Sequence, residues 1–544
     1  MEAEETDLII LWGSNARETH PIFFHHVLKG VKNGTRLYVV DPRRTASAQW
    51  ADSWIGLDVG TDIALSNTIA REIIHSGLAN NKFIQNATTG YEAYAASVEE
   101  WTLERGACET GVSEEVIREM ARSFARADRA MICWTLGITE HHNAVDNVLS
   151  LINLALLTGH VGKWGSGLNP LRGQNNVQGG GDMGAIPNKL PGFQDIENDS
   201  FARAKFEAAW NCAIAPKYGW NLTEMLHAME RRELTTLYVI GENPAQSEAD
   251  AKHANILLEN LEFMVVQDIF LTRTAQMADV VLPASASWCE SEGTVTNSER
   301  RVQRVRKALD PPGNARDDMG IIQDLARLLG HSWDYGPESK EIAENAWNEL
   351  RKLSPMHSGM SYERLESEGG IQWPCANDED AGTPFLHGRL WEDCPEKRGM
   401  PAKFSVVVHD LPVDKLSEEF PIRLTTVRNL DNYNTGVQTG GFASPLRRQE
   451  ALGLAPEDGI RYGAADGELV LVSSRRGSIA MPVRYDSRLR SGLASATLHS
   501  PDDIEINVLT IEANDPKSGT SEFKAAAIRI EKLSVNKESE AEPE

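Results

Sequence analysis

Residues 168–188, LNPLRGQNNVQGGGDMGAIPN, contain residue types that could bind a charged ligand. This stretch holds six side-chain amides and five glycines, but only one cation, Arg172, and one acid, Asp182. Glycines let the backbone approach a ligand closely, and amides such as Gln174 can bond its polar groups. Arg172 is therefore the candidate functional residue of the stretch. The alternative is an ordinary surface arginine in a flexible loop, paired with Asp182.

The stretch follows an apolar helical run at 147–162 and lies between two predicted βαβ units. Their strands are continuous apolar runs without alternation, which is typical of a parallel sheet covered on both faces. The first unit comprises strand 6–13, helix 20–34 and strand 35–44, and the second comprises strand 235–250 with its following loop, helix 251–261 and strand region 262–283.

The two units match when they are aligned on Asp41 and Asp268, the acids that end their second strands. A threonine follows at +4, a glutamine at +8 and an Ala-Asp pair at +10 and +11 in both units. These positions are Thr45, Gln49, Ala51 and Asp52 in the first unit and Thr272, Gln276, Ala278 and Asp279 in the second. Matched polar positions indicate duplication of the unit.

Duplication of a βαβ unit predicts two nucleotide-binding half-sites. Ligands of open parallel sheets bind beyond the carboxyl ends of the strands, where an acid commonly bonds a ribose. Asp41 and Asp268 hold that position, and the loops at 13–21 and 241–250 lead into helices whose amino ends can receive phosphate. The alternative is that each aspartate only caps a turn. Neither loop has the G-x-G-x-x-G spacing, which argues against a nicotinamide cofactor.

Composition excludes several classes of protein. The 544 residues are 41% hydrophobic and 24% charged with a net charge of −25, which argues against a nucleic-acid surface and predicts no membrane segment. The amino terminus has no export-signal pattern, so we expect a cytoplasmic protein. The six cysteines have no spacing that supports a zinc site or an iron–sulfur cluster within this chain.

The predicted fold is α/β: two Rossmann-like, doubly wound parallel-sheet units related by pseudo-symmetry, followed by a carboxyl-terminal β-barrel. The barrel is indicated by short strands after residue 420 and a hairpin that turns at 475–477. The expected boundaries are 1–175 and 176–315 for the dinucleotide-binding domains, 316–417 for a helical and loop connection, 418–534 for the barrel domain and 535–544 for an acidic disordered tail.

Residues 168–188 resemble the substrate-site loop of the molybdenum- or tungsten-dependent formate dehydrogenases, which are molybdopterin oxidoreductases. Further resemblances follow in the order of the family and cover nearly the whole chain. They are LWGSNARETHPI, VVDPRRTASAQWAD, LGITEHHNAVDNV, VVQDIFLTRTAQMADVVLP, TVRNLDNYNTGVQTGG and INVLTIEANDPKSGTSEFKAAAIRI. The resemblance implies that Arg172 orients formate, because a guanidinium donates two parallel hydrogen bonds to a carboxylate.

The family's cofactor is a bis(molybdopterin guanine dinucleotide) with molybdenum or tungsten, which accounts for two nucleotide-binding units. The resemblance also implies a barrel of the double-psi type. It assigns Asn15, Glu18, Asp41 and Arg43 to one dinucleotide, Glu242, Asn243, Gln267, Asp268 and Thr272 to the other, Gln174 to pterin or backbone polar groups, and Arg428, Asn434, Gln438, Asn507 and Lys524 to the barrel side of the pterins. We place His141 and His142 near the cofactor, without a catalytic role.

Members of the family carry a [4Fe–4S] cluster and a selenocysteine or cysteine metal ligand, followed by histidine, upstream of the region that matches residues 6–13. We therefore expect no metal ligand in this chain. It is interpreted either as the downstream portion of a longer enzyme or as a subunit whose amino-terminal part is a separate polypeptide. The implied partners are formate and carbon dioxide, that upstream part and electron-transfer subunits.

Two rival functions remain open on sequence. One is a non-catalytic scaffold that keeps the molybdopterin fold in a redox complex. The substrate loop and both nucleotide half-sites weigh against such a scaffold. The other is a nicotinamide-dependent dehydrogenase, which the missing glycine fingerprint disfavours.

Overall fold

The computed structural model describes residues 2–386, 400–436 and 449–533. The chain divides into two compact units, which we call unit 1 and unit 2. Unit 1 comprises Met1–Asn169, Gln246–Ala254 and Arg389–Glu544, and unit 2 comprises Pro170–Ala245 and Asn255–Gly388. Each unit is described by itself.

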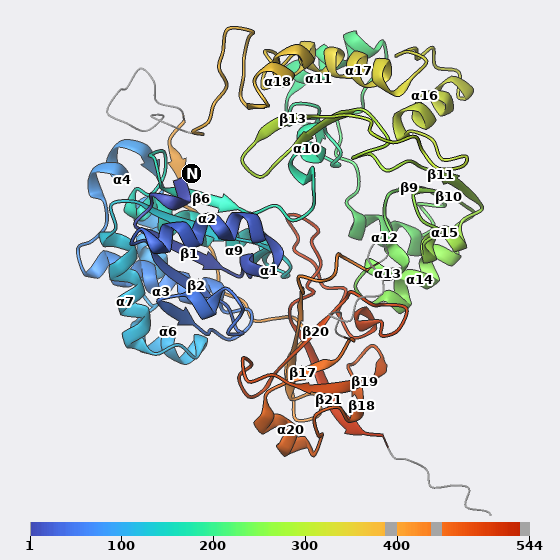
Figure 1. Cartoon of the computed structure of the whole chain (residues 1–544). Coiled ribbons are helices and arrows are strands. Elements are labelled where there is room, and N and C mark those ends of the chain that lie inside the picture. The colour runs from blue at the N-terminus through green and yellow to red at the C-terminus, as the bar shows by residue number, and fades with distance from the viewer. Residues whose placement is uncertain (1, 387–399, 437–448, 534–544) are drawn as a thin grey trace, which may run out of the picture. The chain divides into compact units, whose positions relative to one another are not determined.

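Unit 1 contains a five-stranded sheet in the order β3-β2-β1-β5-β6, drawn mostly in blue in Figure 1. The strands are β1 (Leu8–Trp12), β2 (Arg36–Val40), β3 (Ser53–Ile55), β5 (Ala130–Trp134) and β6 (Gly167–Pro170). β1 is parallel to both β2 and β5, and all five residues of β1 and of β5 are buried. The continuous apolar runs therefore occupy the centre of the sheet, as predicted.

Helices form the rest of the core of this α/β region. The predicted helix at 20–34 is α2 (Pro21–Lys32), which begins with a proline. Proline suits this position, because the first N–H groups of a helix have no partner within the helix and proline has no N–H. The other helices are α1 (Ala16–Thr19), α3 (Asp62–His75), α4 (Asn81–Ala87), α5 (Tyr91–Val98), α6 (Leu103–Thr110), α7 (Glu114–Arg126), α8 (Leu136–Thr139) and α9 (Ala144–Thr158). Short strands β4 (Thr88–Thr89) and β15 (Ala402–Lys403) pair in parallel.

Two glycines bring the ends of β1 and β5 together. Gly13 has φ +56°, and a Cβ on Gly137 would lie 2.5 Å from the carbonyl oxygen of Gly13. No side chain fits there, because both partners are backbone. The close approach sets the shape of the sheet edge that carries the first predicted half-site.

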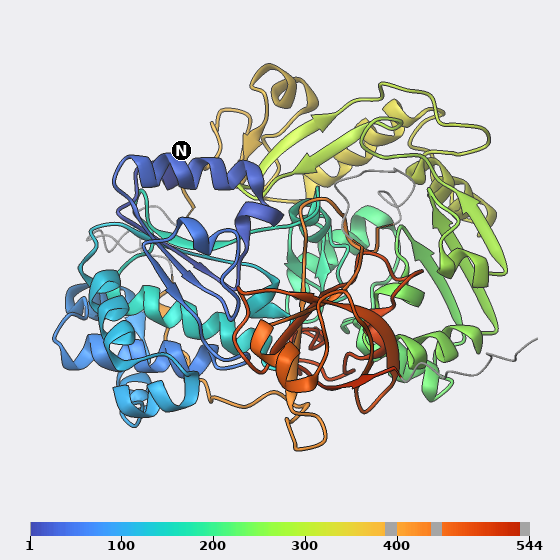
Figure 2. The same ribbon diagram turned by 60° about the horizontal axis from the view of Figure 1, so that its bottom comes forward.

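Unit 1 also contains the predicted barrel. Six strands close in the order β16-β20-β17-β19-β18-β21, seen in orange and red in Figure 2. They are β16 (Ile422–Val427), β17 (Leu452–Leu454), β18 (Leu469–Ser473), β19 (Ser478–Tyr485), β20 (Leu493–Thr497) and β21 (Ala526–Lys532), with helix α20 at Pro456–Tyr462. β18 and β19 form the predicted hairpin, and alternating side chains of the strands fill the core.

Unit 2 contains the second predicted sheet. β9 (Thr236–Ile240), β10 (Phe263–Asp268) and β11 (Val280–Pro283) are parallel, with β10 in the middle. Their core includes Val239, Met264 and Val266. The helices of this part of the sequence are α12 (Leu222–Glu230), α13 (Pro244–Ser247), α14 (Ala251–Glu259) and α15 (Arg273–Met277), of which the stretch Gln246–Ala254 belongs to unit 1.

The remainder of unit 2 combines a small sheet with helices. β12 (Gly293–Thr296), β13 (Arg301–Val305) and β14 (Ile371–Gln372) form an antiparallel sheet. Its helices are α10 (Val177–Asp182), α11 (Ser200–Trp210), α16 (Asp318–Leu328), α17 (Ser339–Leu353) and α18 (Tyr362–Ser367), and β7 (Lys189–Leu190) pairs with β8 (Gln194–Asp195). The α/β fold with parallel sheets and a closed barrel is thus confirmed. The double-psi type and the domain boundaries stay predictions.

Candidate cofactor and substrate sites

The first predicted half-site is a turn fixed by side chain to backbone hydrogen bonds. Oδ1 of Asp41 accepts from the N–H of Arg43 at 3.0 Å, and Oγ1 of Thr45 accepts from the N–H of Ala48 at 3.2 Å. Oδ2 of Asp52 accepts from the N–H of Leu37 at 2.7 Å. Asp41, Thr45 and Asp52, which were identified by their spacing, therefore fix the backbone conformation that follows β2.

The second half-site repeats these three contacts at the matched positions. Oδ1 of Asp268 accepts from the N–H of Phe270 at 2.9 Å. Oγ1 of Thr272 accepts from the N–H of Ala275 at 3.1 Å, and Oδ2 of Asp279 accepts from the N–H of Met264 at 2.7 Å. Each contact spans the same number of residues as its counterpart in unit 1. The offsets in the sequence thus correspond to one local structure built twice.

A further correspondence connects the two loops of each half-site. Oδ1 of Asn15 accepts from the N–H and hydroxyl of Ser47 at 3.2 and 3.1 Å. Oδ1 of Asn243 accepts from the N–H and hydroxyl of Thr274 at 3.2 and 2.8 Å. The family resemblance implied a cofactor role for both asparagines but gave no indication of these partners. A hydroxyl residue at +6 from each aspartate was the available signal.

Charged groups surround the first half-site. Burial raises the pKa of Asp41 to about 6, and the charge of Arg43 opposes this rise. Nδ2 of Asn15 donates to Oε2 of Glu18 at 2.8 Å, so these two predicted cofactor residues contact each other. The carboxyl of Asp41 is therefore poised to hold a hydrogen bond as donor or as acceptor.

An ion pair that sequence spacing did not reveal lies in unit 1. Nζ of Lys524 is 2.8 Å from Oε2 of Glu140, and Nη2 of Arg428 is 3.9 Å from Oε1 of the same carboxylate. Burial opposes ionisation of Glu140, but Lys524 and Arg428 together lower its pKa. Lys524 also donates to the backbone oxygen and the hydroxyl of Thr426, each at 3.0 Å.

Several buried polar atoms of the predicted cofactor residues have no hydrogen-bond partner among the described residues. They are Nε of Arg43, Nη1 of Arg428 and Oδ1 of Asn507, together with Oγ of Ser14 in the loop after β1. Buried polar groups in proteins are normally paired. All four belong to unit 1. The two arginine nitrogens are donors, Oδ1 of Asn507 is an acceptor and the hydroxyl of Ser14 can be either, so together they fit a ligand that carries both phosphates and hydrogen-bonding groups, such as a dinucleotide.

The remaining predicted residues differ in their surroundings. Asn434 has φ +45°, and its carbonyl oxygen accepts from Nδ1 of His499 at 2.6 Å. Gln438 lies outside the described residues. In unit 2 the side chain of Gln267 is buried and bonded to Tyr238 and, at 2.5 Å, to Oδ1 of Asp318. Burial raises the pKa of Glu242.

Arg172 is exposed, in the loop between β6 and α10. Its Nε donates to Oε1 of Gln178 at 3.2 Å, and Nε2 of Gln178 donates to Oδ1 of Asp182 at 2.9 Å. Gln178 thus lies between the two residues that the sequence had paired as an alternative. Gln174 is exposed in the same loop.

The two histidines lie beside a buried carboxylate, but only His142 is hydrogen-bonded to it, because Nδ1 of His141 has no hydrogen-bond partner among the described residues. Nδ1 of His142 is 3.0 Å from Oε1 of Glu522, and Nδ1 of His141 is 3.7 Å from the same oxygen. Burial opposes ionisation of Glu522, yet His141 and His142 lower its pKa to about 2. The contact with Glu522 raises the pKa of His142.

Metal-binding and membrane-spanning features were sought in the described part of the chain. There, no three histidine, cysteine, aspartate or glutamate side chains gather in a cluster that could hold a metal ion. Nor is any helix within the described ranges both long and apolar enough to cross a membrane.

Comparison with known families identifies the class of the protein. Residues 2–328 match the family model described as "Molybdopterin oxidoreductase", and residues 422–527 match "Molydopterin dinucleotide binding domain". The first match covers both predicted βαβ units, and the second covers most of the barrel. The chain belongs to the molybdopterin oxidoreductase family, as the sequence resemblance implied.

Individual relatives of known sequence or structure were also found. The chain is 41% identical over 532 residues to the F420-dependent formate dehydrogenase 2 subunit alpha of Methanococcus maripaludis, covering 97% of this chain and 77% of that protein. It is 38% identical over 545 residues to formate dehydrogenase H of Escherichia coli, covering 99% and 74%. The fold also resembles acetylene hydratase from Pelobacter acetylenicus, with TM-score 0.73, 21% identity and coverage of 97% and 78%.

Proposed function

We propose that the chain is the catalytic-subunit portion of a formate dehydrogenase. It would oxidise formate to carbon dioxide at a molybdenum or tungsten centre held by two pterin guanine dinucleotides. One observation carries the proposal: the arginine-containing substrate loop occurs in a chain that builds the same nucleotide-binding turn twice. The similarity to two formate dehydrogenases supports the same substrate.

The reaction is HCOO⁻ → CO₂ + H⁺ + 2e⁻, and the bound metal–pterin group would supply the acceptor for the electron pair. Arg172 would bind the carboxylate of formate through two parallel hydrogen bonds and fix the direction of its C–H bond. The guanidinium keeps its charge throughout, so it neither gives nor takes the proton. Arg172 is exposed, so its guanidinium is accessible to a small carboxylate.

Each βαβ unit would bind one dinucleotide. Asn15, Glu18, Asp41 and Arg43 serve the first, with Arg428, Asn434, Gln438, Asn507 and Lys524 of the barrel domain, and Glu242, Asn243, Asp268 and Thr272 serve the second, with Gln174 beside the substrate loop. Gln267 would stabilise the second site without bonding the dinucleotide through its side chain, because that side chain is already bonded to Tyr238 and Asp318. The repeated hydrogen bonds support a pseudo-symmetric pair of Rossmann-like units.

The partners follow from the family resemblance. A portion upstream of residues 6–13 would supply the metal ligand and a [4Fe–4S] cluster, and electron-transfer subunits would accept the electrons. The two formate dehydrogenases compared above are longer than this chain. We propose a cytoplasmic enzyme.

Cofactor analysis tests the proposal against its rivals. Purified enzyme should contain molybdenum or tungsten and two pterin guanine dinucleotides per chain, and formate should reduce an artificial electron acceptor. A scaffold that binds no metal would show neither, and a nicotinamide enzyme would reduce NAD⁺ without pterin. Either result would contradict the proposal.

A further inference from the structure

A continuous series of hydrogen bonds begins at Arg172 and ends at Trp373 within unit 2. Nε of Arg172 donates to Oε1 of Gln178 at 3.2 Å. Nε2 of Gln178 donates to Oδ1 of Asp182 at 2.9 Å, and Nε1 of Trp373 donates to Oδ2 of Asp182 at 2.8 Å. Asp182 is 1% exposed, so both oxygens of a buried carboxylate are used by this series.

The chemistry of the three groups fixes the direction of each bond. An ionised carboxylate only accepts hydrogen bonds, whereas a side-chain amide has one accepting and one donating end. Because Asp182 takes the NH₂ end of Gln178, the carbonyl end must face Arg172. A guanidinium only donates, so this is the amide orientation that Arg172 requires. The carboxylate therefore selects which end of Gln178 meets the arginine.

The backbone holds Asp182 in place. Its carbonyl oxygen accepts from the N–H of Gly192 at 2.7 Å. At the other end of α10, Oδ1 of Asn176 accepts from the N–H of Thr296 at 2.9 Å. A Cβ on Gly179 would lie 1.9 Å from that same oxygen, so only glycine fits the turn. The short helix is thus tied to β12 rather than free to turn.

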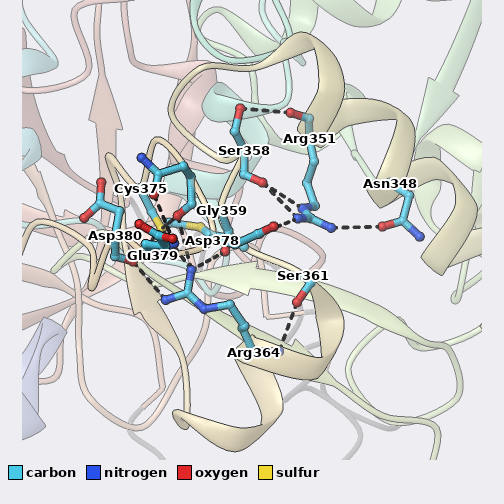
Figure 3. A network of polar contacts seen from close by, with 12 residues as sticks. Asn348, Arg351, Ser358, Gly359, Ser361, Arg364, Cys375, Asp378, Glu379 and Asp380 are labelled. Atoms are coloured by element: carbon cyan, nitrogen blue, oxygen red, sulfur yellow. Dashed lines mark hydrogen bonds and ion pairs between the residues drawn. The ribbon is translucent and has the colours of Figure 1, made fainter.

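Two arginines, Arg351 and Arg364, bind the chain before and after Trp373 in the sequence, and Figure 3 shows their contacts. Arg364 donates to the carbonyl oxygens of Gly359 at 2.6 Å and Asp380 at 2.8 Å. Arg351 lies 3.2 Å from Oδ1 of Asp378 and donates to the carbonyl oxygen of Ser358. The two arginines therefore hold the chain both before Trp373, at Ser358 and Gly359, and after it, at Asp378 and Asp380.

We propose that Asp182 is a positioning residue for Arg172. Acting through Gln178, its carboxylate sets the orientation in which the guanidinium receives formate, and Trp373 holds that carboxylate. The inference rests on the proposed function of Arg172.

Steady-state kinetics of the cofactor-loaded enzyme test this role. Asp182→Asn lets the amide of Gln178 turn over, so the KM for formate should rise roughly tenfold with kcat changed less than about threefold. Gln178→Ala should do the same. Asp199→Asn is the matched control, since the carboxylate of Asp199 accepts from the N–H of Ala202 at the start of α11 and is not part of this series of bonds. It should leave KM unchanged.

The background of Arg172→Lys separates positioning from a general structural effect. Lysine has no Nε donor at the position of the guanidinium, so adding Asp182→Asn should change kcat/KM by less than about twofold. If Asp182→Asn lowers kcat/KM by the same factor in the Arg172→Lys background as in the parent, the positioning role is contradicted. Unchanged turnover in Arg172→Ala would instead contradict the proposed function, which makes the two failures distinguishable.

An NMR measurement on the full 544-residue chain is independent of turnover. With ¹⁵N-labelled tryptophan, the indole N–H resonance of Trp373 is assigned by its loss in Trp373→Phe. Asp182→Asn should shift this resonance, because an amide oxygen replaces a carboxylate as acceptor. The control Asp199→Asn should not. An unmoved Trp373 resonance in Asp182→Asn would show that the series of bonds does not exist.

Discussion

Glu140 and Lys524 show how single residues prepare the first cofactor region. Both side chains are about one-tenth exposed, and their charged atoms are 2.8 Å apart. A buried pair of charges gains little over a neutral pair, but removal of one partner leaves an uncompensated charge. The charge of Lys524 is therefore already compensated by Glu140, and a ligand that contacts Lys524 meets an ion pair rather than an isolated cation.

Replacement of Lys524 should reveal this balance. Lys524→Met leaves Glu140 buried without its nearest cation and should lower the free energy of unfolding by about 3 kcal/mol. The double variant Glu140→Gln with Lys524→Met should recover a large part of the loss, because no buried charge stays unpaired. Urea unfolding of the chain without cofactor measures both. Equal losses in the single and double variants would contradict the assigned pairing.

The carboxylate of Glu522 predicts a pH dependence of stability. Its folded pKa of about 2 lies below the usual 4.5, so its contribution is present above pH 4.5 and is lost as pH falls toward 2. The raised pKa of His142 gives the opposite sign: its contribution is present below its usual value of 6.5 and is lost as pH rises through the folded pKa. Asp410 also faces His142, and Asp62 faces His141.

The opposite pH dependences of Glu522 and His142 define a pH range in which both contribute to stability. The stability difference between the parent and Glu522→Gln should be largest between about pH 4.5 and 6.5 and should shrink on both sides. Denaturant unfolding across pH 3–9 measures it, with Asp199→Asn as the charge-matched control. A difference that is constant with pH would show that folding does not change the pKa of Glu522 or of His142.

At the scale of elements, the edge between β1 and β5 depends on backbone contact. Gly137→Ala would place a Cβ 2.5 Å from a carbonyl oxygen, which forces the two turns apart and should cost about 1–3 kcal/mol. Gly320→Ala, whose Cβ would meet only Oδ2 of Asp317 at 4.0 Å, should be neutral or stabilising. Thermal unfolding of both variants checks this. An unchanged Gly137→Ala protein would refute the close approach.

Sequence reasoning predicted the elements whose signals are local. The strands around Asp41 and Asp268 were recognisable because apolar runs end at acids that bond the backbone two residues on. Asp182 and Trp373 are 191 residues apart, and Glu140 and Lys524 are 384 apart. No periodicity connects such positions, since their contact depends on how whole elements pack. The pairing of β14 with β13 was missed for the same reason, because the paired residues Val302 and Ile371 are far apart in the sequence, whereas β12 and β13 form a local hairpin that went unnoticed.

At the scale of the whole molecule, the substrate loop and the two repeated turns have different roles. The proposed contacts to the cofactor are spread over both βαβ units and the barrel, whereas the proposed recognition of formate depends on one guanidinium. Loss of one cofactor contact should therefore lower loading only in part. Loss of Arg172 should remove activity while loading persists.

Kinetics of Arg172 variants in the cofactor-loaded enzyme test this division most directly. Arg172→Ala removes two charge-assisted hydrogen bonds, which should cost on the order of 2–5 kcal/mol, or roughly 30- to several-thousand-fold in kcat/KM for formate. Arg172→Lys should recover only part, because an ammonium keeps the charge without the planar fork. Metal and pterin content should equal the parent's in both variants. Activity of Arg172→Ala within a fewfold of the parent, at full cofactor loading, would contradict the proposal that this arginine binds formate.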